Sequence, residues 1–164
     1  TRGLPGSMMP GVYGNVYQIV QGPRYVVIIY EMVHETRVVT LDGRPHPDSR
    51  VRMYIGDSKG HWEGSTLVVE TTNLTGKTAY RGASEHLKMT ERFRPIAPNV
   101  IDWSATFDDP HTWARSWTFG MNLSKKDDSQ GPFEYACHEG NYGMVNSLKG
   151  ARALDKTAAQ DPRK

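Results

Sequence analysis

Two glutamates occur among apolar residues in strand-like segments, where an ionised carboxylate is unusual. Glu91 stands between Met89 and Phe93 in an alternating stretch, and Glu31 has the same parity as Val27. A carboxylate on a buried face is either paired or carries a raised pKa. A carboxyl group with a raised pKa can act as a general acid or base near neutral pH. The pattern therefore predicts that Glu31 and Glu91 are interior groups that orient a ligand or transfer a proton.

An internal ion pair is the alternative reading of these glutamates, with Arg37 or Arg92 as the partner. Ion-pair networks in protein interiors perturb pKa values as catalytic sites do. In an enzyme, Arg37 would stabilise a developing anion. In a structural pair, it would only neutralise the carboxylate. The residue types leave both readings open.

A second polar cluster, residues 137–142, lies where the last predicted strand meets a predicted helix. His138 is a candidate proton shuttle or metal ligand, because its charge changes near neutral pH. Glu139 and Tyr142 are candidate ligand contacts beside it. Asn141 has the simpler role of capping the helix. Cys137 is the single cysteine of the chain, and a lone thiol most often behaves as a small buried hydrophobe.

Three further residues are candidate ligand contacts, namely His34, Trp62 and Trp113. His34 precedes Glu35 but has no second histidine four residues later, so it does not form the helical zinc motif. A metal held jointly by His34 and His138 would need a proximity that the sequence does not contain, and no metal or organic cofactor is predicted. Aromatic side chains with a few polar groups line small-molecule cavities, although they also fill β cores.

The elements that must position these residues are mostly strands. Alternation and β-branched runs predict strands bounded by turn residues. They are expected at 16–20, 25–31, 34–41, 51–55, 66–72, 87–94, 101–108, 113–123 and 133–138. Loops are expected at 44–50, 56–64 and 73–85, and a helix at 141–154 where the period changes.

A run of about eight short strands predicts a mainly β fold, an antiparallel barrel or barrel-like sandwich of lipocalin-like architecture with a short C-terminal helix. No helices alternate with the strands, which excludes a parallel α/β sheet. One domain is expected over residues 1–154, followed by a polar tail at 155–164.

Composition narrows the function classes. The chain has 164 residues, 23% of them charged, and a net charge of +2, with no basic run that would favour a nucleic-acid partner. No apolar run approaches the ~20 residues that span a bilayer. Phosphate-binding loops, dinucleotide fingerprints and nucleophile elbows are also absent from the sequence.

A set of short motifs spread over most of the chain resembles a family of uncharacterised secreted bacterial proteins, whose members often open with a PDLSGVW-type segment that is absent here. The motifs are IVQ at 19–21, YE at 30–31, Arg37, LDGRP at 41–45, GDS at 56–58, WEG at 62–64, TLVV at 66–69, ERF at 91–93, DDP at 108–110 and EYACHEGNY at 134–142.

The resemblance implies an exported protein, secreted or periplasmic. It also implies a second cysteine upstream of Thr1 in full-length relatives, which would make a disulfide with Cys137 plausible. It implies no activity, so three functions remain. The first is a small-molecule-binding barrel. The second is a cofactor-independent acid–base enzyme, a lyase, isomerase or hydrolase acting on a sugar or aromatic compound. The third is a structural or assembly protein.

Overall fold

The computed structural model describes residues 4, 6–11, 15–78, 80–126, 140 and 142–159, with only the backbone described at 78 and 158. The chain divides into two compact units, Thr1–Glu134 and Tyr135–Lys164. The first unit holds a β-sheet, and the second holds a helix.

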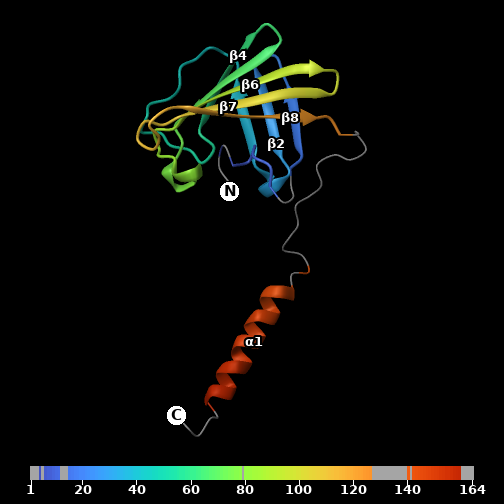
Figure 1. Ribbon diagram of the computed structural model, residues 1–164, viewed down its shortest axis with the longest axis vertical. Helices are drawn as coiled ribbons and strands as arrows, with labels where there is room; N and C mark the ends of the chain where they lie inside the picture. The colour runs from blue at the N-terminus through green and yellow to red at the C-terminus, as the bar shows by residue number, and fades with distance from the viewer. Residues whose placement is uncertain are drawn as a thin grey trace. The chain divides into compact units, whose positions relative to one another are not determined.

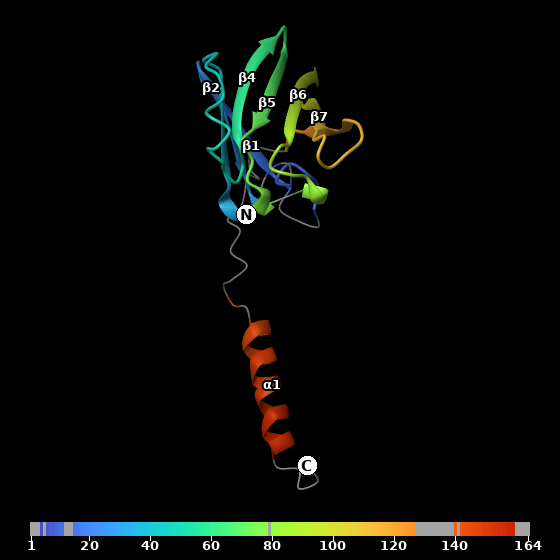
Figure 2. The ribbon, with the colours of Figure 1, turned by 90° about the vertical axis from the view of Figure 1, so that its left-hand side faces the viewer.

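The first unit is built on one eight-stranded sheet in which the strands follow one another in chain order. Figure 1 and Figure 2 show these strands arranged around a strongly curved surface, so that the sheet forms a half-barrel. The strands are β1 (Tyr17–Gln21), β2 (Tyr25–Tyr30), β3 (Thr36–Thr40), β4 (Asp57–Glu63), β5 (Thr66–Thr72), β6 (Lys88–Ala97), β7 (Val100–Asp108) and β8 (Trp117–Ser124). Three short 3-10 turns are described between strands: η1 (Met32–His34), η2 (Gly76–Thr78) and η3 (Tyr80–Gly82).

The predicted fold class is confirmed: the protein is mainly β and mostly antiparallel, with a curled sheet and a C-terminal helix. The curl is incomplete within the described ranges, because β1 pairs only with β2 and β8 pairs only with β7. The first and last strands are therefore edges of an open half-barrel.

β4 is the largest departure from the sequence-based expectation, because residues 56–64 were predicted to be a loop. The segment pairs with β5 along its whole length, from Asp57 opposite Thr72 to Glu63 opposite Thr66. The bounding glycines Gly56 and Gly64 suggested a loop. The central Gly60 serves packing, since a Cβ there would lie 2.8 Å from a Val39 methyl. Glycine in a strand interior often marks such a close approach.

The predicted strand at 51–55 is reduced to one isolated bridge between Met53 and Leu74. The predicted strand at 113–123 begins only at Trp117. The predicted strand at 133–138 lies outside the described residues.

The junction of β3 with β4 differs from every other pairing in the sheet. The two strands run parallel and pair only at Val39 with Ser58 and at Thr40 with Lys59. All other pairings are antiparallel and join strands that are consecutive in the chain. A parallel pair needs a long crossover, which residues 41–56 supply. The sheet thus consists of two antiparallel meanders, β1–β3 and β4–β8, joined by a short parallel contact.

Period-2 alternation places the concave face of the sheet in the core. On β7 the inward residues Trp103, Ala105 and Phe107 are fully buried. The same face carries Val26 and Ile28 of β2, and residues from other strands and from the N-terminal segment complete the core. The other buried apolar residues are Leu4, Met8, Tyr30, Met32, Val39, Leu67, Val68, Val69, Leu74, Ala83, Leu87, Met89 and Phe93.

The second unit contains helix α1 (Tyr142–Ala159), which extends five residues past the predicted end at Leu154. Residues 155–159, expected to be part of a tail, therefore belong to the helix. Within the described residues, no helix combines the length and apolar character that crossing a membrane requires.

Candidate functional site

Arg37 and Glu91 form a buried ion pair on the concave face, and their side chains are 1% and 0% exposed. Arg37 Nη2 donates to Glu91 Oε2 and, at 2.7 Å, to the hydroxyl of Thr71. Arg37 Nε donates to the hydroxyl of Ser58 at 2.8 Å, and Trp103 Nε1 donates to Glu91 Oε1 at 3.1 Å. The network draws one side chain from each strand between β3 and β7, so it crosses the parallel junction.

The electrostatics of this network keep Arg37 charged. Burial opposes the charge of Arg37, but Glu91 and Tyr30 raise the pKa of Arg37 above its ordinary value. Burial also disfavours the charged form of the Tyr30 phenol, and this raises the pKa of Tyr30 and keeps the phenol protonated. A buried charge is tolerable when it is paired and hydrogen-bonded. The alternative of an internal ion pair is confirmed for Glu91, with Arg37 as the partner.

The network gives Glu91 no route to a substrate. Both carboxylate oxygens already accept hydrogen bonds, and the side chain is 0% exposed. A general acid or base must come within hydrogen-bond reach of the proton it transfers. The geometry therefore favours the structural reading of the pair over the catalytic one.

Glu31 lies just beyond the end of β2, and the prediction that it shares a buried face was wrong. The buried residues of β2 are Val26, Ile28 and Tyr30, which have the opposite parity. Glu31 is half-buried, and its carboxylate accepts a hydrogen bond from the amide of Val16 at 3.2 Å. That contact holds the chain entering β1.

The remaining predicted contacts are scattered. His34 is exposed at the end of η1, in a left-handed conformation with φ 53°. Trp62 is 44% exposed on β4. Trp113 follows β7 and packs edge-on against Trp117, with ring centroids 5.4 Å apart. The structure does not bring these three residues together with Arg37 and Glu91.

The other predicted residues lie elsewhere. Tyr142 is 74% exposed at the start of α1, in the second compact unit. Cys137, His138 and Glu139 lie outside the described residues. In the part of the chain that the structure describes, no three histidine, cysteine, aspartate or glutamate side chains gather as a metal site would require.

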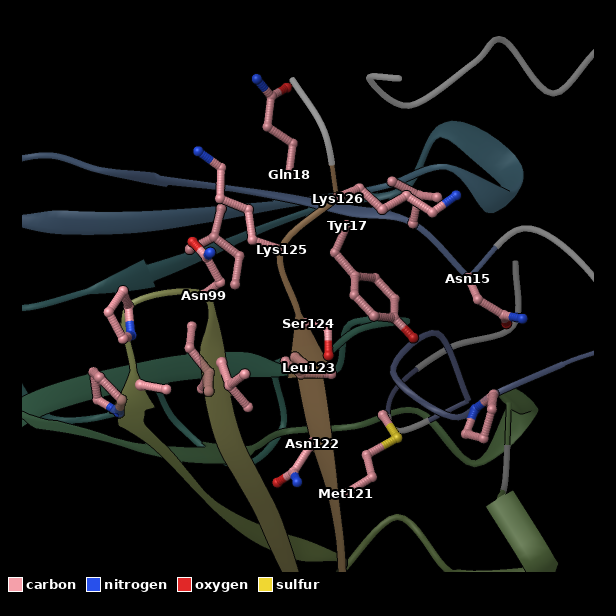
Figure 3. Close-up of a pocket in the computed structure, with 18 residues that line it drawn as sticks. Asn15, Tyr17, Gln18, Asn99, Met121, Asn122, Leu123, Ser124, Lys125 and Lys126 are labelled. Atoms are coloured by element: carbon pink, nitrogen blue, oxygen red, sulfur yellow. The ribbon is translucent and has the colours of Figure 1, made fainter. Parts of the chain in front are cut away.

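A cavity of about 830 Å³ lies at the open side of the half-barrel (Figure 3). It is bounded by the start of β1, the turn between β6 and β7, and the end of β8. Its lining residues are Pro10, Asn15, Val16, Tyr17, Gln18, Ile19, Pro95, Ala97, Pro98, Asn99, Val100, Ile101, Met121, Asn122, Leu123, Ser124, Lys125 and Lys126.

The apolar part of this lining continues the inward face of the sheet beyond the buried core. Ile101 pairs with Leu123 across β7 and β8, and Met121 pairs with the core residue Trp103. Ile101, Met121 and Leu123 are all half-buried. On the opposite edge, Ile19 of β1 is 40% exposed. Residues that a closed barrel would bury are thus left lining a cavity.

Tyr17 is fixed in place at the β1 side of the cavity. Its hydroxyl donates to the carbonyl of Met8 at 2.9 Å, and its ring packs edge-on against Tyr30 with centroids 5.7 Å apart. Edge-to-face aromatic pairs of this kind are favourable. Because the core residue Tyr30 anchors the ring, this wall of the cavity is preformed.

No sequence pattern predicted this cavity. Period-2 alternation in 113–123 puts Met121 and Leu123 on one face, but a core wall and a cavity wall have the same pattern. The missing information is how near the first strand comes to the last, which no local spacing encodes.

Comparison of the chain with family models, curated proteins and solved structures gives no match.

Proposed function

We propose that the protein binds a small, largely apolar molecule in the cavity between β1 and β8. The observation that carries the proposal is a volume of about 830 Å³ lined by half-buried apolar side chains. Ligand pockets in proteins occupy roughly 300–1,000 Å³ and combine apolar walls with a few polar groups. Here the polar groups are Asn99, Asn122 and Ser124, together with other residues of the rim.

The acid–base enzyme has less support than the binding protein. The groups that would transfer protons are Glu31, which holds the amide of Val16, and Glu91, which is sealed in the ion pair with Arg37. Glu31, Arg37 and Glu91 are all absent from the lining of the cavity. The predicted proton shuttle His138 lies outside the described residues. An assembly role would also use exposed apolar side chains, and the concave shape and volume of this site favour a small molecule over a partner protein.

Titration with N-phenyl-1-naphthylamine, a neutral apolar fluorophore, tests the proposal. Saturable 1:1 binding with a blue shift of the emission is expected. Leu123→Trp fills the cavity from one wall and should weaken the affinity at least ~10-fold, or about 1.4 kcal/mol. The matched control is Thr118→Trp, because Thr118 is exposed on the same strand and does not line the cavity.

Thermal unfolding of both variants verifies that each is folded at the temperature of the titration. Absence of saturable binding to the unmodified protein would refute the proposal. Equal affinity in both variants would also refute it, because the fluorophore would then bind at another place.

A further inference from the structure

Three buried side-chain atoms in the part of the chain that the structure describes have no hydrogen-bond partner: the Tyr30 hydroxyl, Arg37 Nη1 and the Thr40 hydroxyl. Buried polar groups in proteins are almost always paired, either with protein atoms or with ordered water. Each of these atoms is therefore a place where a further partner is expected. Tyr30 and Arg37 lie on the buried face of the sheet, whereas Thr40 has the opposite parity to Arg37 on β3.

The register of β2 with β3 makes Tyr30 and Arg37 diagonal neighbours. Arg37 is paired with Ile28, and Tyr30 lies two residues beyond Ile28 on the same buried face. Diagonal positions across an antiparallel pair are within reach of long and aromatic side chains. The phenol and the guanidinium are close enough to act on each other electrostatically, yet both atoms lack a hydrogen bond of acceptable geometry. Two unpaired polar groups thus lie side by side in the interior.

Both groups retain hydrogen-bonding capacity. Of the five guanidinium N–H donors, those on Nε and Nη2 are engaged by Ser58, Thr71 and Glu91, and the two on Nη1 remain. The Tyr30 hydroxyl can both donate and accept. Neither residue reaches bulk water, because Tyr30 is 2% and Arg37 1% exposed. A single oxygen atom that accepts from Nη1 and bonds to the phenol satisfies both groups at once.

We infer that one internal water molecule binds between the Tyr30 hydroxyl and Arg37 Nη1 and completes the hydrogen-bond network of the interior. Water suits the electrostatics, because Glu91 already neutralises Arg37 and leaves no net positive charge for an anion. Glu35 is also close enough to act on the phenol, which places a further negative charge nearby. A metal cation is disfavoured, because Nη1 carries donors and no lone pair. Buried waters typically make about two to four hydrogen bonds to groups of this kind.

The N-terminal segment packs beside the water site. Met8 is fully buried, and its carbonyl accepts from the hydroxyl of Tyr17, whose ring packs edge-on against Tyr30. The Ser7 hydroxyl donates to the carboxylate of Glu35, and the Glu35 carbonyl accepts from the amide of Tyr30. The water is therefore enclosed by protein, and it joins β2 to a network that runs from β3 to β7. This inference does not depend on the ligand of the cavity.

A high-resolution crystal structure of the protein tests the inference directly. An isolated peak of electron density is expected within about 3.2 Å of both Arg37 Nη1 and the Tyr30 hydroxyl oxygen. A direct hydrogen bond between these two atoms, with no peak beside them, would overturn the inference. A protein group that fills the position would overturn it as well.

Tyr30→Phe removes the hydroxyl and keeps the ring, and Tyr25→Phe is the matched control because Tyr25 is 46% exposed on the same strand. Crystals of Tyr30→Phe should lose the peak, since a buried water needs at least two polar partners, and crystals of Tyr25→Phe should keep it. The thermal midpoint should fall by ~2–6 °C for Tyr30→Phe and change by less than ~2 °C for Tyr25→Phe.

A peak of unchanged occupancy in Tyr30→Phe would overturn the shared site, because the phenol would then not hold the water. If Tyr30→Phe does not fold, the crystal structure of the unmodified protein still decides between a bridging water and a direct bond.

Discussion

Replacing Glu91 with glutamine removes one charge of the buried pair and keeps the shape of the side chain. In the folded protein, Glu91 accepts from two different donors, one on Arg37 and one on Trp103. Glutamine has a single carbonyl oxygen, so its NH₂ group must face one of those donors. Arg37 is 1% exposed and then stays buried without a counter-charge. Breaking a buried pair in this way costs about 3–5 kcal/mol of unfolding free energy.

That loss is large against the ~5–15 kcal/mol that stabilises a domain. Urea denaturation at pH 7, followed by tryptophan fluorescence, measures it. The matched control is Glu63→Gln, which removes an exposed Glu–Arg pair with Arg92, the side chains being 49% and 48% exposed. An exposed pair contributes about 0–1 kcal/mol. The double variant Arg37→Met/Glu91→Leu should recover much of the loss, because it leaves no buried charge.

The recovery should be incomplete. Three polar partners of the pair, namely Ser58, Thr71 and Trp103, lose their hydrogen bonds to it in the double variant. A loss of unfolding free energy for Glu91→Gln no larger than that of the exposed control would show that burial of the pair carries no such cost. Strict additivity of the Arg37→Met and Glu91→Leu single changes would likewise contradict the pairing, since residues in one network must couple.

Two further changes test the loops that flank the sheet. Asp109→Asn should lower the unfolding free energy by about 1–3 kcal/mol at pH 7, because the buried carboxylate accepts from the Ser84 hydroxyl at 2.9 Å and the Thr112 hydroxyl at 2.8 Å. Burial alone would raise the pKa of Asp109, but these hydrogen bonds and those from nearby amides lower it. The extra unfolding free energy of the unmodified protein over Asp109→Asn is therefore full above pH ~4 and shrinks as the pH falls further. Gly56→Ala should cost about 2 kcal/mol or more, because Gly56 has φ +68° and a Cβ would lie 2.5 Å from the Thr72 carbonyl oxygen.

Each of these changes has a definite check. Denaturation midpoints of Asp109→Asn and the unmodified protein between pH 2.5 and 7 should converge toward acid, and parallel curves would contradict the pKa argument. For Gly56→Ala, the control is Gly43→Ala, since Gly43 has φ +69° but open space around its Cβ position. Equal costs at Gly56 and Gly43 would mean that the steric contact contributes nothing.

The sequence predicted the fold class and offered the buried pair as one of two readings of Glu91, because apolar and polar side chains alternate through residues 87–94 except at that glutamate. Glu91 interrupts that pattern visibly. The same reasoning misplaced Glu31, because Tyr25–Tyr30 is apolar at every position and alternation cannot identify its buried face.

The polar strand β4 and the cavity were missed for a different reason. Residues 57–63 form a strand because β5 offers a complete pairing partner, which outweighs the weak strand preference of Asp57 and Gly60. The cavity depends on how far the sheet curls toward closing the gap between its first and last strands. That property belongs to the whole sheet, and no segment of the sequence carries it.

The parallel contact between β3 and β4 has a consequence for the order in which the sheet assembles. Each antiparallel pairing closes a shorter connection than the crossover at 41–56, although residues 73–87 between β5 and β6 are nearly as long. Short closures cost less chain entropy and form sooner. The contact at Val39–Ser58 and Thr40–Lys59 is too small to hold two preformed meanders together. We expect Arg37 to leave water when the two meanders dock, because its buried partner Glu91 lies on the other meander. A polar contact of the interior thus joins the two halves of the sheet alongside their shared apolar core.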